Sequence, residues 1–179
     1  MAKQGPNLRL ILGDQARLKS REMLPAPFLE TGIPRGAIIE VLGASAAHWC
    51  LEFLRVHSRF RALWCERDRT ICPRTIERLG VRLDRMKFVY GGNLRVPIAR
   101  AMLSDSFQVV LAPAGCSDAA ALDELRLLTE KANSVLFLIN DGRRAPSQDW
   151  PITMQLQIRR RSEEADFSVR VVKQTYAHH

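Results

Sequence analysis

The fold is decided by residues 32–53, which read GIPRGAIIEVLGASAAHWCLEF. The run from Ala37 to Leu42 is short and almost entirely apolar, which is typical of a buried strand. Gly43 follows this run directly, and large apolar residues then recur at helical spacing from Trp49 to Phe60. The stretch therefore predicts a buried strand, a tight loop and a helix over residues 46–60. Phosphate-binding loops are built in this order.

The loop of this stretch lacks the residues that bind a phosphate. If Gly43 is the first glycine of the pattern G-x-x-x-x-G-K-[ST], His48 replaces the second glycine, Trp49 the lysine and Cys50 the hydroxyl residue. The lysine supplies positive charge to the phosphates, and the hydroxyl binds Mg²⁺. An indole supplies neither, and we expect its bulk to fill the space of a phosphate. In the alternative interpretation, Gly43 is an ordinary turn glycine and the stretch is unrelated to nucleotide loops.

Composition limits the class of protein. The 179 residues are enough for one domain with a sizeable core. No apolar run approaches the length of a membrane span, so we expect a cytoplasmic protein without membrane contact. The four cysteines form no C-x-x-C pair and no metal-binding pattern, which predicts reduced thiols and no metal. The formal charge of +8 allows an acidic partner such as nucleic acid, although surplus arginine is also typical of a solvated surface.

Beyond this stretch, short apolar runs alternate with helical segments. This alternation predicts right-handed βαβ units and therefore an α/β fold with a mostly parallel, twisted sheet flanked by helices. The predicted strands are 62–66, 86–90, 107–111 and 135–139, and the predicted helices are 73–79, 96–103 and one that begins at Ser117 or Asp118.

The two ends of the chain differ from this central pattern. Residues 152–158 and 167–173 alternate between apolar and polar residues, which predicts a C-terminal antiparallel hairpin that extends the sheet. Residues 1–31 are predicted to form an N-terminal arm, in which Pro25 and Pro27 interrupt any helix. The arm either packs on the domain or docks on a partner. The domain itself is assigned to residues 32–179.

In this order, the segments resemble the RecA recombinase core. The resemblance covers roughly residues 30–175 and implies a RecA-like fold. Its pieces are the strand and loop at 32–43, the helix end at 78–81, the strand at 136–140 that would enter the second DNA-binding loop, and the closing hairpin at 158–160 and 169–173.

The departures from RecA bear on catalysis. Ala112 stands where the ATPase has the carboxylate that orders Mg²⁺, and Asp141 replaces the glutamine that senses the γ-phosphate. Asp68 lies near the position of the catalytic glutamate, but one carboxylate cannot replace the missing lysine and metal ligands. The resemblance therefore implies a RecA-like protein without ATPase activity, catalytic residues or cofactor. An ATPase of an altered type is the alternative, and it would need a charge-neutralising group that this loop no longer offers.

Residues 33–40, Ile-Pro-Arg-Gly-Ala-Ile-Ile-Glu, are similar to the entry motif of the ImuA family. Its members are accessory factors of a damage-induced mutagenic polymerase cassette. The resemblance implies a role in the DNA-damage (SOS) response and in translesion synthesis. The implied partners are RecA, an ImuB-like polymerase adaptor and, by direct contact, DNA. The alternative is the related SulA family of cell-division inhibitors, which bind FtsZ. The oligomeric state stays open.

Five arginines are candidates for contact with DNA or a partner. Arg143 and Arg144 lie where the second DNA loop of RecA begins, and Arg159, Arg160 and Arg161 lie at the start of the hairpin. Arginine at these places can bind phosphates, and such contacts weaken steeply with salt. The alternative is a solvated surface.

Overall fold

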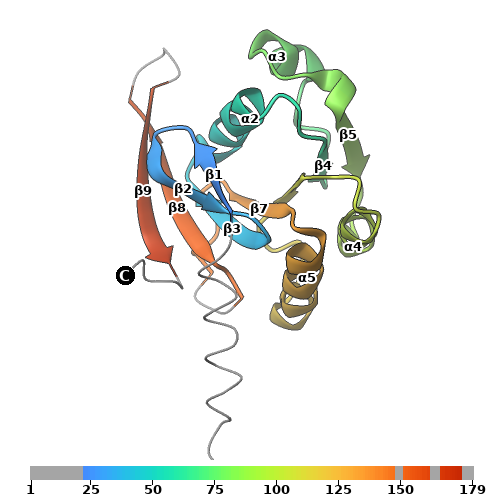
Figure 1. Ribbon diagram of the computed structural model, residues 1–179. Coiled ribbons are helices and arrows are strands. Elements are labelled where there is room, and N and C mark those ends of the chain that lie inside the picture. Colours follow the sequence, from blue (N-terminus) through green and yellow to red (C-terminus); the bar gives the residue numbers. More distant parts are fainter. Residues whose placement is uncertain (1–21, 148–150, 162–165, 175–179) are drawn as a thin grey trace, which may run out of the picture.

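The computed structural model of the protein describes residues 22–147, 151–161 and 166–174. Its centre is a seven-stranded sheet (Figure 1). The strands are β3 (Ala37–Leu42), β4 (Ala62–Glu66), β5 (Met86–Tyr90), β6 (Val109–Pro113), β7 (Val135–Asn140), β8 (Met154–Arg160) and β9 (Phe167–Gln174). They lie in the order β5-β4-β6-β7-β3-β8-β9. All neighbours are parallel except the antiparallel pair β8 and β9, which confirms the predicted sheet and its C-terminal hairpin.

Helices cover both faces of this sheet (Figure 1). They are α2 (Ala46–Val56), α3 (Pro73–Arg78), α4 (Arg95–Leu103) and α5 (Ala119–Ala132), with a 3-10 turn, η1, at Leu83–Arg85. One apolar cluster joins α2 and α3 to Ile39 and Val41 of β3, and the other joins α4 and α5 to Ile38 of the same strand. Because successive strand residues point to opposite faces, a strand covered on both sides needs apolar residues at nearly every position. The continuous apolar runs of the sequence have this origin.

The N-terminal part of the described chain forms a hairpin that the sequence did not predict. Strand β1 (Met23–Ala26) pairs antiparallel with β2 (Leu29–Pro34), which crosses the position where we separated arm from domain. Leu24 and Ile33 are buried in the same cluster as α2. Residues 22–31 therefore pack on the domain. The earlier residues of the predicted arm lie outside the described part of the chain.

Several element boundaries differ from prediction. Helix α2 ends at Val56 instead of residue 60, where the N–H of His57 closes the last turn on the carbonyl of Phe53. Strand β6 begins at Val109, two residues later than predicted. Of the two predicted caps for α5, Asp118 is the one used, since its Oδ1 accepts a hydrogen bond of 2.8 Å from the N–H of Ala121.

Candidate functional site

The predicted site residues follow the carboxyl ends of three adjacent strands, β7, β3 and β8. Ligands of open α/β sheets bind at this edge, because the loops after the strands can converge there. Gly43 follows β3, Arg143 and Arg144 follow β7, and Arg159–Arg161 close β8. We call this the carboxyl edge.

The connection from β3 to α2 is a closed turn. Only Gly43, Ala44 and Ser45 separate the strand from the helix. The N–H of Gly43 donates to the carbonyl of Asn140 at 2.8 Å, and the N–H of Ala46 donates to the carbonyl of Gly43 at 3.0 Å. Residues 46–50, which a phosphate loop would use to wrap around its ligand, are already helical.

Gly43 is required here by its contact with β8. Its φ is +117°, and a Cβ added to it would overlap the carbonyl oxygen of Ile158. This contact gives Gly43 a role in the packing of the sheet that is independent of any phosphate, in agreement with the alternative interpretation of this glycine.

Replacing Gly43 with alanine is expected to lower the free energy of unfolding by about 1–3 kcal/mol, because a side chain there is strained and meets β8 backbone. Urea denaturation measures this change. Gly92→Ala is the matched control, since an added Cβ meets nothing within 4 Å. Equal effects of the two substitutions would contradict the assigned contact.

Trp49 points into the core. It is fully buried, its Nε1–H donates to the carbonyl of Pro27 at 2.9 Å, and its ring meets that of Phe137 edge-on at 6.0 Å. The indole therefore lies in the apolar core beneath the β1–β2 hairpin. His57, the residue that follows α2, contacts the carbonyl of Pro25 through its Nε2 at 2.7 Å. The helix thus anchors the hairpin at two points.

His48 and Cys50, the neighbours of Trp49 in sequence, also contact residues of the domain. Cys50 is fully buried, and burial raises the pKa of its thiol far above the ordinary value. The ring of His48 lies 5.5 Å from that of Phe167 at the start of β9. Burial, and secondarily the nearby Arg160, lower the pKa of His48 below its ordinary value.

The five candidate arginines share the carboxyl edge but form two separate groups. Arg143 is 89% exposed and pairs with Asp141 at 3.2 Å. Arg159, Arg160 and Arg161 are exposed at the end of β8. Because β3 lies between β7 and β8, the two strand ends are about 10 Å apart. The structure therefore does not bring the two groups into one cluster.

Arg67 is a further basic residue at this edge that the sequence analysis missed. It follows β4, and its Nη2 donates to the carbonyl of Gly115 at 3.1 Å. The guanidinium of Arg144 occupies the space that a Cβ of Gly115 would need. Arg67 and Arg144 thus meet at Gly115, just after β6. Its position in the sequence could have predicted this, because Arg67 directly follows a buried strand, as residues 141–144 do.

A buried carboxylate positions the loop after β7. Glu40, in the middle of β3, is fully buried on the α4–α5 side of the sheet. It accepts hydrogen bonds from Asn140 Nδ2 at 3.1 Å, from the N–H and Oγ of Ser147 at 3.0 and 3.2 Å, and from Gln155 Nε2 at 2.7 Å. These bonds tie both ends of the loop that carries Arg143 and Arg144 to the centre of the sheet.

The remaining predicted positions, Ala112 and Asp68, differ in burial. Ala112 is fully buried within β6, and Asp68 is exposed in the turn after β4, where its carbonyl accepts from the N–H of Thr70 at 2.7 Å. Among the residues that the structure describes, no three His, Cys, Asp or Glu side chains are grouped to hold a metal ion. The described ranges also contain no helix with the length and apolarity needed to cross a membrane.

The fold and this edge define an α/β protein with a mostly parallel core sheet, basic loops at its carboxyl edge and a closed turn after β3. No protein-family model matches the chain. A comparison with curated proteins likewise found no match.

Proposed function

We propose that the protein is a non-catalytic, RecA-like accessory factor of the bacterial DNA-damage response and of translesion synthesis. It binds RecA and an ImuB-like polymerase adaptor through surfaces of its α/β domain. One observation carries the non-catalytic part: α2 begins at Ala46 and buries Trp49, so the connection after β3 leaves no loop to wrap a nucleotide phosphate. The resemblance of residues 32–43 to RecA and of residues 33–40 to the ImuA family supports the rest.

The carboxyl edge is the proposed contact surface for DNA or for the protein partner. Arg67 and Arg144 lie together at Gly115, and no carboxylate in the described part of the chain is paired with either guanidinium. Like charges repel at close range, so an anionic group between them would be favourable. Guanidinium groups bind phosphate and carboxylate oxygens in a fork geometry, which suits both a DNA backbone and an acidic protein surface.

Co-sedimentation with RecA filaments on single-stranded DNA tests this function. We expect the protein to pellet with the filament, and the variant Arg67→Gln/Arg144→Gln to pellet several-fold less. Binding to free RecA, to FtsZ and to bare DNA is measured in parallel. Binding to FtsZ alone, with slowed FtsZ polymerisation, would replace the proposal with the SulA-like alternative. Failure to bind RecA in either form would contradict the RecA-directed proposal.

A further inference from the structure

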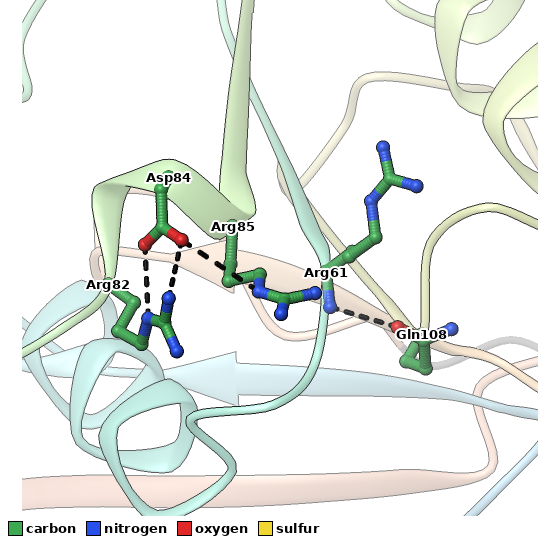
Figure 2. Close-up of polar contacts among 5 residues, drawn as sticks. All are labelled: Arg61, Arg82, Asp84, Arg85 and Gln108. Carbon is green, nitrogen blue, oxygen red and sulfur yellow. Dashed lines mark hydrogen bonds and ion pairs between the residues drawn. The ribbon is translucent and has the colours of Figure 1, made fainter.

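A second basic surface lies at the opposite edge of the sheet, where the parallel strands begin. Arg61 directly precedes β4, Arg82–Arg85 precede β5, and Gln108 directly precedes β6. Since β5, β4 and β6 are neighbours in the sheet, these residues form a row about two strand spacings, or about 10 Å, wide. Figure 2 shows them together. We call Arg61, Arg82, Asp84, Arg85 and Gln108 the amino-edge row.

The row carries more positive than negative charge. Asp84 accepts two hydrogen bonds from Arg82, at 3.1 Å from Nε and 2.6 Å from Nη2, and it lies 3.9 Å from Nε of Arg85 (Figure 2). One carboxylate is thus shared by two guanidinium groups, which leaves a positive charge uncompensated. The side chains of Arg82, Asp84 and Arg85 are 52%, 59% and 42% exposed, so the groups are accessible to a partner.

Arg61 adds a second uncompensated positive charge, and its backbone is held by hydrogen bonds to Gln108. Its backbone N–H donates to Oε1 of Gln108 at 2.9 Å (Figure 2). Its carbonyl accepts from the N–H of Gln108 at 3.0 Å. Its guanidinium lies over the ring of Phe107, 5.7 Å from the centroid. No carboxylate of the described residues forms an ion pair with it. Two further exposed residues of opposite charge, Arg59 and Asp105, precede β4 and β6 in the sequence.

We propose that the amino-edge row binds the phosphate backbone of nucleic acid. The row carries three guanidinium groups and one carboxylate, so its chemistry suits an anionic partner such as phosphate. None of the five residues is apolar, and none of the large apolar residues that the described chain exposes belongs to the row. Arginine forks bind phosphate oxygens in pairs of hydrogen bonds without reading the base sequence.

The inference is independent of the proposed function. The amino-edge row lies where the parallel strands begin, whereas the RecA-directed proposal uses the carboxyl edge, where they end. A protein with both surfaces can hold a nucleic-acid backbone while the carboxyl edge engages another partner.

Fluorescence anisotropy of a short labelled DNA duplex, titrated with the full chain at several salt concentrations, tests the amino-edge row. The test variant is Arg61→Gln/Arg85→Gln. Each phosphate contact contributes about 0.9 to the slope of log affinity against log salt, so we expect this slope to shrink by about two. We also expect weaker binding at low salt, to the same degree for unrelated duplex sequences.

The matched control is Arg74→Gln/Arg170→Gln. It removes the same charge from exposed positions on α3 and β9, outside both the row and the loops of the carboxyl edge. Unfolding curves of both variants show whether the fold is retained. The inference would be overturned if both variants lost binding equally or if the test variant did not change. It would also be overturned if the wild type bound polyglutamate as well as DNA, or did not bind DNA. None of these results would decide whether RecA is bound.

Discussion

We expect the substitution Glu40→Ala to lower the free energy of unfolding by about 3 kcal/mol or more. Four donor contacts end on this one buried carboxylate, and an unmatched buried donor costs about 1–3 kcal/mol. Some of these donors will reach water once the loop after β7 loosens, so the costs do not simply add. Urea denaturation followed by circular dichroism measures the change.

The control for this prediction is Glu40→Gln. It keeps the size of the side chain and one acceptor oxygen but places an amide against the donors Asn140 and Gln155. We therefore expect an intermediate loss of stability. If the alanine and glutamine variants were as stable as the wild type, the hydrogen bonds of Glu40 would not be what holds the loop. A loss of RecA co-sedimentation by a folded Glu40→Gln protein would link the loop to function.

The variant Trp49→Lys, which places a lysine where the phosphate-loop pattern has one, is expected to destabilise the protein without creating a nucleotide site. Removing a buried Trp costs about 3–5 kcal/mol, and the lysine would in addition place an ammonium in the apolar cluster around Phe53 and Phe137. We expect no gain in Mg-ATP binding, measured by calorimetry alongside a denaturation curve.

Trp49→Phe is the control, because it keeps an aromatic ring and removes the Nε1–H that donates to Pro27. Its expected cost is about 1–3 kcal/mol, for the smaller ring and the unmatched carbonyl. A stable Trp49→Lys protein that binds Mg-ATP tightly would show that residue 49 faces a phosphate site. Tight Mg-ATP binding by the wild type that Trp49→Ala left unchanged would contradict our interpretation of this loop.

The short apolar runs predicted the type and the approximate place of most elements. Strands β3 to β5, β7 and β9 lie where period-two or continuous apolar patterns placed them, because a strand buried on one or both faces must carry that pattern. Strand β8 (Met154–Arg160) begins and ends two residues later than the predicted 152–158. The hairpin of β1 and β2 was missed, since Pro25 and Pro27 argue against helix but give no positive signal for a strand.

The sequence alone therefore determined the class of fold, because apolar periodicity and the order of the elements can be read locally along the chain. Only the tertiary structure decided the partners of the side chains. Glu40 meets donors 100 to 115 positions further along the chain, and Arg67 meets Arg144 at Gly115. Such pairs follow from the order of strands across the sheet, which sets neighbours independently of their distance in sequence. Local periodicity fixes which face a residue occupies, but not what lies opposite to it.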